Sequence, residues 1–481
     1  PIYDLANAKL TRFVRDGKLL YWKSTYRYRK NDVRRGQGSR PVICRSVKPT
    51  RSGMDGELLQ EKSSRARKPK MARGYENWAL QRSRTESVAY NNPFSVLPFY
   101  HYDFRRYISD ADPDGPFAKV VPPGGRPGET PGPYVGFKLY TAEGYRPLEL
   151  AADSPYAGMS LSGLSTRDRN NIVRFQTGHT KLVELQRNFY QKCEDSGTPV
   201  LCHCSDGGVY THDRELYVKL FADKQAYPRY RQRSKRWFND HYVHPKAWRR
   251  VLTKYPKLKL CLAHWGGIDH WRRFSKDWRR WRTRTNNYSA KGKRSFSWIE
   301  ECVRLIYAYD NFYVDLAYLP LFQLLDDETR DRRKLKRARA YEQRGIQWDY
   351  LSYLLDEDKG RGGKLRRRIL WGTDWYMFGQ DFESYGEYLS RNISALEKIQ
   401  QRAGIAQNLF HQFAVVNNCR YLALPEIAEP LYQHFRAVGG NAKQRAKIAG
   451  NRWRIDAFKR LDAQKMQSQL DRNSQLTFEE L

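Results

Sequence analysis

The chain has 481 residues, which is too long for one small core and suits either one large barrel with insertions or two to three domains. Its 87 lysines and arginines against 52 aspartates and glutamates give a formal charge of +35, which produces a strong positive field. That charge is extreme for an ordinary metabolic enzyme and favours acidic partners: nucleic acid, anionic lipid or an anionic substrate. The sequence has no run of about 18 to 20 apolar residues, so we expect no transmembrane helix.

The cysteines indicate a reducing compartment. They are odd in number and sparse, and several lie in apolar, strand-like runs where a free thiol behaves as a small hydrophobe. The sequence has no hydrophobic region typical of a secretory signal. We therefore expect an intracellular protein, of the cytoplasm or an organelle matrix. The seven cysteines are Cys44, Cys193, Cys202, Cys204, Cys261, Cys302 and Cys419.

The first 90 residues are strongly basic. They hold 22 Lys and Arg against 8 Asp and Glu, a net charge of +14 (22 − 8). Such blocks are typical of extended arms and long loops. We predict that residues 1–90 form a basic N-terminal arm together with the first segments of the fold.

Short strand-like segments recur along the chain. Each has four to eight residues of β-branched, aromatic or other apolar type and ends in a polar or glycine-containing turn. Helical patterns lie between them, as over residues 179–197 and 244–257, and strands that alternate with helices form a parallel sheet. The predicted strands lie within residues 40–47, 94–106, 134–145, 198–208, 258–267, 311–318 and 366–377.

Seven such strands are one short of an eight-stranded α/β barrel, in which the chemistry lies at the carboxyl ends of the strands. Lys138, His203, His264 and Asp374 all stand at or near those ends. A catalytic metal site needs imidazoles and carboxylates from different strands, with one position open for water. His203, His264 and Asp374 together meet this requirement. Taken singly, each histidine could be a hydrogen-bonded core residue, and Asp374 could cap a helix.

Residues beside these candidates have simpler interpretations. Cys202 and Cys204 flank His203 on one strand, so both point to the opposite face, and we expect them to pack against helices. Asp315 ends its strand and is interpreted as a hydrogen-bond anchor. His101 is interpreted as a half-buried residue among aromatic neighbours.

Four residues are candidates for substrate binding. Trp265 and Trp375 each follow a candidate ligand and could wall a pocket for a planar or apolar substrate, with aromatic packing as the alternative. Arg105 could hold a substrate carboxylate by a bidentate contact, with a helix start as the alternative. Lys138 is the fourth candidate.

Two long insertions and a tail complete the chain. Residues 110–133 form a loop rich in Pro and Gly, and residues 425–481 are helical in pattern. The second insertion is residues 267–297. Within it, residues 271–284, WRRFSKDWRRWRTR, interleave Arg with Trp, a pattern that can contact phosphates while stacking on bases or lie on an anionic membrane. The alternative is a solvated helix whose tryptophans dock on the barrel. Nucleic-acid or membrane contact through basic segments therefore stays open.

Several of these segments together resemble a known family. They are PFYHYDFRR, VGFKLYTAEGY, GTPVLCHCSDGG, HPKAWRRVLTKYPKLKLCLAHWGG, NFYVDLAY, RILWGTDWYM and FAVVNNCRYLAL. From about Pro93 to Leu424 the chain resembles the amidohydrolase superfamily, in the branch that contains aminocarboxymuconate-semialdehyde decarboxylase. The resemblance implies a distorted (β/α)8 TIM barrel over residues 91–424 that holds zinc, manganese or a similar divalent ion.

The resemblance also implies roles for single residues. His203 would be the strand-five metal ligand, and His264 the strand-six histidine that binds metal or polarises the substrate. Asp374 would be the strand-eight carboxylate that ligates metal and takes a proton from the attacking water. Lys138 lies on the fourth strand, where this branch implies a substrate-binding or structural residue and some relatives use a carboxylated lysine between two metals.

One feature of the family is missing. Its members begin the barrel with a His-x-His pair on strand one, and the ten histidines here contain no such pair. Three explanations remain. Strand one lies upstream of Pro1, or residues 18–26, KLLYWKSTY, are a degenerate strand one, or His101 or His212 substitutes for the pair.

We therefore predict a metal-dependent hydrolase whose metal-activated water attacks an amide, lactone or related carbonyl carbon. One alternative is a non-oxidative decarboxylase on the same barrel. The other is a catalytically degenerate barrel that serves as a basic structural or RNA-associated component of a larger assembly. The expected partners are a small, anionic substrate and further copies of the chain in a homo-oligomer.

Overall fold

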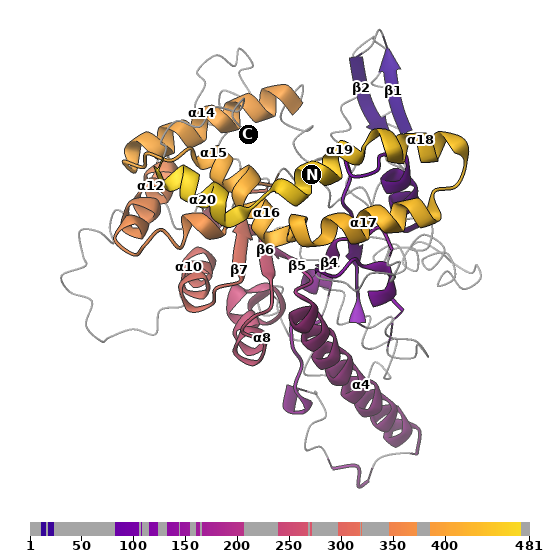
Figure 1. The fold of residues 1–481 in the computed structure, drawn as a ribbon. Coiled ribbons are helices and arrows are strands. Elements are labelled where there is room, and N and C mark those ends of the chain that lie inside the picture. The colour runs from indigo at the N-terminus through magenta and orange to yellow at the C-terminus, as the bar shows by residue number, and fades with distance from the viewer. Residues whose placement is uncertain are drawn as a thin grey trace, which may run out of the picture.

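The computed structural model describes residues 11–15, 18–23, 82–104, 107, 115–123, 132–143, 145–153, 160–163, 166–205, 239–267, 270–271, 297–317, 319, 346–372 and 385–472. Within these ranges the chain is a mixed α/β fold around a six-stranded parallel sheet (Figure 1). None of the helices in this part of the chain is long and apolar enough to cross a membrane.

The strands of the sheet follow one another in the order of the sequence, each parallel to the next. This order requires a crossover between each pair of neighbouring strands, and α4, α8, α10 and α12 lie in the four connections from β4 to β8. Six of the seven predicted strands are thereby confirmed, while residues 40–47 lie outside the described residues. The strands are β3 (Phe99–His101), β4 (Gly136–Leu139), β5 (Val200–Ser205), β6 (Leu260–Gly266), β7 (Phe312–Asp315) and β8 (Ile369–Leu370).

A separate hairpin lies near the N-terminus. β1 (Thr11–Arg15) pairs antiparallel with β2 (Lys18–Lys23), with Arg15 opposite Lys18. The explanation that residues 18–26 supply a degenerate barrel strand is therefore wrong, because β2 belongs to a two-stranded sheet distinct from the six-stranded one. The physical reason is the Asp-Gly pair between the strands, which favours a tight hairpin turn over the long crossover that parallel pairing needs.

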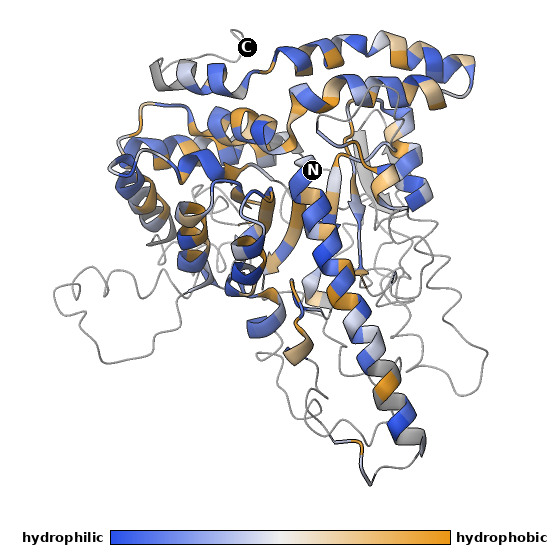
Figure 2. Cartoon of the chain, turned by 60° about the horizontal axis from the view of Figure 1, so that its bottom comes forward, coloured by the Kyte–Doolittle hydropathy of each residue, from blue (hydrophilic) through white to orange (hydrophobic). Residues whose placement is uncertain are grey.

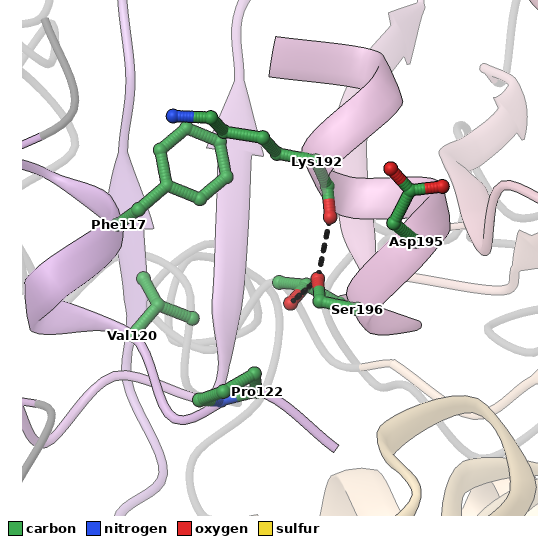
Figure 3. Close-up of a pocket in the computed structure, with 7 residues that line it drawn as sticks. Phe117, Val120, Pro122, Lys192, Asp195 and Ser196 are labelled. Atoms are coloured by element: carbon green, nitrogen blue, oxygen red, sulfur yellow. Dashed lines mark hydrogen bonds between the residues drawn. The ribbon is translucent and has the colours of Figure 1, made fainter. Parts of the chain in front are cut away.

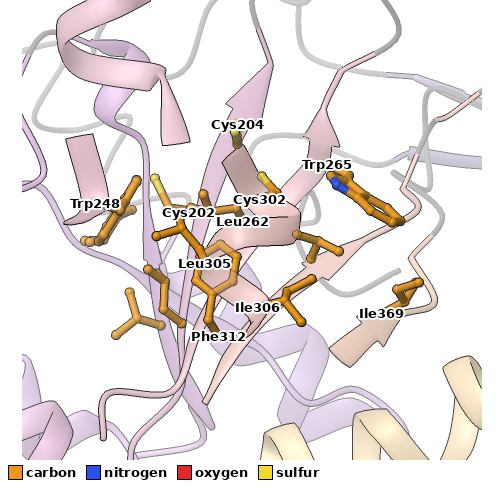
Figure 4. Packing of buried hydrophobic residues seen from close by; sticks show 14 of the residues in the cluster. Cys202, Cys204, Trp248, Leu262, Trp265, Cys302, Leu305, Ile306, Phe312 and Ile369 are labelled. Carbon is orange, nitrogen blue, oxygen red and sulfur yellow. The ribbon is translucent and has the colours of Figure 1, made fainter. Parts of the chain in front are cut away.

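One face of the sheet packs against the crossover helices. Cys202 and Cys204 on β5 and Leu262 on β6 lie in one buried cluster with Trp248 and Cys302 (Figure 4). The prediction that the two β5 cysteines point into helix packing is confirmed. Burial raises the pKa of the Cys202 thiol to about 11, so this sulfur is a packing group rather than a nucleophile.

The C-terminal segment covers the other face. Leu201 and Tyr313 alternate with the residues of the first cluster and belong to a second cluster with residues of α16 and α17. The ring of Tyr421 on α16 stacks on Phe99 at 6.4 Å between centroids and lies 5.2 Å from the ring of Tyr313. Figure 2 shows hydrophobic strands at the centre and many hydrophilic residues on the outer helices. Both faces of the sheet are therefore buried.

The helices agree with the predicted helical patterns. Residues 179–197 lie almost wholly within α4, and residues 244–257 form a 3-10 turn, Pro245–Trp248, that continues into α8. The described part of the tail, residues 425–472, is helical as predicted. Besides a helix over residues 82–91, the helices are α4 (Thr166–Ser196), α8 (Arg249–Lys254), α10 (Trp298–Ala308), α12 (Ile346–Lys359), α14 (Tyr385–Arg402), α15 (Leu409–His411), α16 (Asn417–Leu422), α17 (Leu424–Val438), α18 (Ala442–Gly450), α19 (Arg452–Arg460) and α20 (Ala463–Arg472).

Candidate functional site

Polar side chains gather at the carboxyl edge of the sheet. Lys138 lies near the end of β4, His203 near the end of β5, His264 near the end of β6, and Asp315 ends β7. The register places Lys138 beside Leu201 and His203 beside Ala263 on adjacent strands. Because parallel strands end at the same edge, four neighbouring strands each deliver one polar residue to one region.

The two histidines are close together. The centroids of the His203 and His264 rings are 4.9 Å apart, with an angle of 68° between the ring planes. A tetrahedral zinc ion with Zn–N bonds of about 2.0–2.1 Å places the centroids of two ligating imidazoles roughly 5 Å apart. His203 is 6 % exposed, and His264 is partly exposed. Their separation fits a shared cation.

Asp315 and Ala317 hold His264 in place. The backbone N–H of His264 donates to Asp315 Oδ1 at 2.8 Å, and the N–H of Ala317 donates to the same oxygen at 2.9 Å. The Nδ1 atom of His264 lies 2.8 Å from the carbonyl oxygen of Ala317. Since a carbonyl only accepts, Nδ1 carries the proton and Nε2 keeps its lone pair, as in a metal-ligating histidine. The interpretation of Asp315 as a hydrogen-bond anchor is confirmed.

The end of β6 has a strained backbone. His264 has φ +66°, Trp265 +38°, Gly266 +83° and Gly267 +80°, so four successive residues are left-handed. The two that are not glycine each cost about 1–2 kcal/mol there. A Cβ on Gly267 would lie 2.8 Å from the Cβ of Ser205, so glycine is required where β5 and β6 approach. Strain of this kind is typical of functional sites.

Tyr140 joins the histidines in one row of rings. Its ring stacks on His203 with 4.5 Å between centroids and 15° between planes, and the ring of His101 on β3 meets it edge-on at 6.5 Å. The Nζ atom of Lys138 is 5.8 Å from the Tyr140 centroid. Tyr140 was not predicted from the sequence, although its position two residues beyond Lys138 at a strand end was a usable signal.

Trp265 does not lie beside the histidines. It is fully buried, its Nε1 donates to the carbonyl oxygen of Ile299 at 3.4 Å, and its ring meets Trp271 edge-on at 5.1 Å. The left-handed turn sends its side chain toward α10 and the helix-side cluster. Aromatic packing, the alternative considered for Trp265, therefore describes its position.

The remaining predicted residues, Arg105, Asp374, Trp375 and His212, lie outside the described residues, as does nearly all of residues 271–284. Gly372, two positions before Asp374, is described. A Cβ on Gly372 would lie 2.9 Å from the Cβ of Ala317 and 3.4 Å from the Cγ of Asp315. Gly372 therefore packs on the loop that holds His264. Among the described residues no three His, Cys, Asp or Glu side chains form a metal-binding group.

A shallow cavity of about 400 Å³ lies elsewhere (Figure 3). It is formed between the 3-10 turn Phe117–Lys119 and the C-terminal end of α4, where Lys192 Nζ lies 5.4 Å from the ring centroid of Phe117. Thr198, which lines it, precedes β5, so the cavity is near the amino ends of the strands and contains none of the candidate ligands.

Comparisons of the chain with protein-family models, curated proteins and solved structures give no match. The resemblance to the amidohydrolase superfamily therefore stays a prediction that rests on the motifs of the sequence.

Proposed function

We propose that the protein is a metal-dependent hydrolase of the amidohydrolase type. The observation that carries the proposal is the pairing of His203 with His264, whose rings are 4.9 Å apart while His264 Nδ1 is bound to a backbone carbonyl. This arrangement supports two imidazole ligands for one divalent cation, zinc or manganese.

The sheet is proposed to be part of a (β/α)8 barrel. Six parallel strands in sequence order, with helices in the crossovers, are what strands three to eight of such a barrel would provide. The four polar residues at the carboxyl ends of β4 to β7 also occupy the edge where barrel enzymes carry their chemistry.

In the proposed mechanism, His203 and His264 would hold the cation with Asp374 as the third ligand, and Asp374 would accept the proton of the attacking water. When bound, zinc supplies a Lewis acid that brings the pKa of a coordinated water near 7. The Lys138 ammonium group lies on the strand beside His203 and attracts an anionic substrate. The bond that is cleaved is an amide, lactone or related carbonyl bond of that substrate. Arg105 and Trp375 are proposed to contact the substrate.

Metal content tests the proposal. The purified full chain is expected to contain about one equivalent of zinc or manganese by elemental analysis. His203→Ala and His264→Ala should each lose it, while His434→Gln, a buried histidine on α17, should retain it. Circular dichroism of each variant checks the fold. A metal-free wild-type protein, or His203→Ala protein with undiminished metal, would contradict the proposal.

A product assay and an assay of retained RNA separate the hydrolase from its alternatives. Release of CO2 from a carboxylated substrate without hydrolysis would identify the decarboxylase, which would use the same cation and Lys138. A metal-free protein that retains RNA through purification would instead identify the degenerate barrel, which the charge of +35 favours.

A further inference from the structure

Trp453 on α19 is unusually exposed for its size. It is 58 % exposed, whereas Ile455, two residues further along the same helix, is fully buried. Positions two apart on a helix point in nearly opposite directions, so Ile455 anchors α19 while Trp453 faces outward. The guanidinium carbon of Arg454 lies 4.4 Å from the centroid of the Trp453 ring. The helix thus presents an indole with a cation beside it.

The surroundings of Trp453 are strongly basic. Residues 436–460 contain eight Lys and Arg and one acidic residue, Asp456, a net charge of +7 (8 − 1). Two of these cations are engaged within the helices: Arg452 pairs with Asp456 and Glu429, and Lys459 also contacts Glu429. The cations that are exposed and lie outside these ion pairs are Arg436, Lys443, Arg445, Lys447 and Arg460, with Arg454 half-exposed.

The helices that carry these groups, α18 and α19, pack on the core of the protein. Ile448 on α18 and Ile455 on α19 belong to the core cluster that also covers the sheet. Arg452 lies 4.1 Å from the ring centroid of Tyr432 on α17, which joins α19 to its neighbour. Arg460 is seven residues after Trp453 and therefore lies on the same face of α19. Trp453, Arg454 and Arg460 form a fixed surface, which we call the α19 surface.

We infer that the α19 surface binds single-stranded nucleic acid, with a base stacked on Trp453 and phosphates held by Arg454, Arg460 and the cations of α18. Stacking platforms among basic side chains are the usual means of binding single strands. A membrane-binding helix would instead need a continuous exposed apolar face. On α17 to α19 the large exposed hydrophobic residues among those described are Trp453 and Val438.

The test uses the full chain and a fluorescein-labelled 20-nucleotide oligo(U), with fluorescence anisotropy measured at several salt concentrations. Trp453→Ala should weaken binding roughly 10-fold, which corresponds to the loss of one stacked base. Trp453→Tyr keeps a stacking ring and should bind nearly as the wild type does, whereas Trp453→Leu keeps apolar area and should bind as weakly as Trp453→Ala.

Charge variants complete the test. Arg454→Glu with Arg460→Glu should weaken binding and reduce the slope of log K against log salt by about 0.7 for each phosphate that is no longer neutralised. Lys398→Glu, at an exposed lysine on α14, is the control for a single charge reversal and should change affinity less than about 2-fold, as expected for one distant charge. Circular dichroism establishes that each variant is folded.

Three outcomes would overturn the inference: no binding of oligo(U), equal binding by Trp453→Ala and wild type, or a weakening by the charge variants no greater than that of Lys398→Glu. Tighter binding of a 20-base-pair duplex than of oligo(U) would also overturn it. Binding to vesicles of phosphatidylcholine and phosphatidylserine that Trp453→Leu retains, without binding to oligo(U), would assign the surface to a membrane instead.

Discussion

The Nδ1 atom of His264 lies 2.8 Å from the carbonyl oxygen of Ala317, and one carboxylate oxygen of Asp315 accepts hydrogen bonds from the backbone N–H groups of both residues. These three bonds form a closed clamp between the ends of β6 and β7. The clamp fixes both the rotation of the imidazole and its tautomer, so Asp315 positions His264 through backbone hydrogen bonds.

Substitution of Asp315 should therefore weaken metal binding. Asp315→Leu removes the acceptor that fixes the Ala317 carbonyl, and we expect zinc affinity to fall about 10- to 100-fold, the usual effect of losing a group that orients a ligand. Asp315→Asn keeps one oxygen, so its zinc affinity should fall less than that of Asp315→Leu. Competition with a chromophoric chelator measures the affinity. The control is Asp310→Asn, because the Asp310 side chain is 84 % exposed. Equal zinc affinities for Asp315→Leu and Asp310→Asn would show that the clamp does not contribute to metal binding.

The stacking of Tyr140 on His203 should contribute to stability. Tyr140→Phe keeps the parallel ring at 4.5 Å and should lower the unfolding free energy less than Tyr140→Ala does. Tyr140→Ala removes the stacked ring and should cost about 0.5–1.5 kcal/mol beyond the effect of the reduced buried area. Urea denaturation of the two variants compares them directly. A Tyr140→Phe variant as unstable as Tyr140→Ala would assign the effect to the hydroxyl instead.

Asp358 should be among the most sensitive carboxylates of the fold. It is fully buried and accepts hydrogen bonds from the N–H groups of Leu365 and Arg366 and from the Tyr307 hydroxyl at 2.8–3.0 Å. Asp358→Ala leaves these donors unsatisfied and should lower the free energy of unfolding by about 3–5 kcal/mol. Asp356→Ala, on the same helix and paired with Lys359 at the surface, should cost less than about 1 kcal/mol. Similar losses in the two variants would contradict this assignment.

Buried histidines should make the fold sensitive to acid. Burial lowers the pKa of His434 to about 4 and that of His244 to about 3. The unfolded chain, with histidine pKa values near 6.5, therefore binds more protons between about pH 6.5 and these lower values. The stabilisation from these two neutral histidines is fully present above about pH 6.5. As the pH decreases below this value, the free energy of unfolding falls by up to about 1.4 kcal/mol per pH unit for each histidine.

His434→Gln tests this sensitivity. The variant loses the bond between the His434 ring and the Tyr90 hydroxyl at 3.0 Å, so it should be less stable at neutral pH. Its unfolding free energy should nevertheless decline less steeply between about pH 6.5 and about pH 4.5 than that of the wild type. Urea titrations at several pH values give both slopes, and parallel slopes would rule out His434 as a contributor.

Apolar runs predicted the sheet well, because buried parallel strands need continuous hydrophobic segments. The alternation of successive side chains along a strand predicted the two faces of β5. That is why His203 and the cysteines beside it were placed correctly. Alternation failed at His264 and Trp265, where left-handed backbone changes the direction of successive side chains. The contacts of Tyr140 depend on loop geometry beyond β4, which periodicity does not encode. The Asp-Gly pair after Arg15 was a hairpin signal that the strand interpretation overlooked.

The most direct measurement of the central claim is zinc K-edge X-ray absorption on the purified chain and on its His203→Ala and His264→Ala variants. We predict a nitrogen and oxygen shell at about 2.0–2.1 Å, with the scattering pattern of two imidazoles in the wild type and loss of this signal in both variants. Absence of both zinc and manganese, a sulfur shell at about 2.3 Å, or an unchanged spectrum in either variant would contradict the claim that these two histidines share a cation.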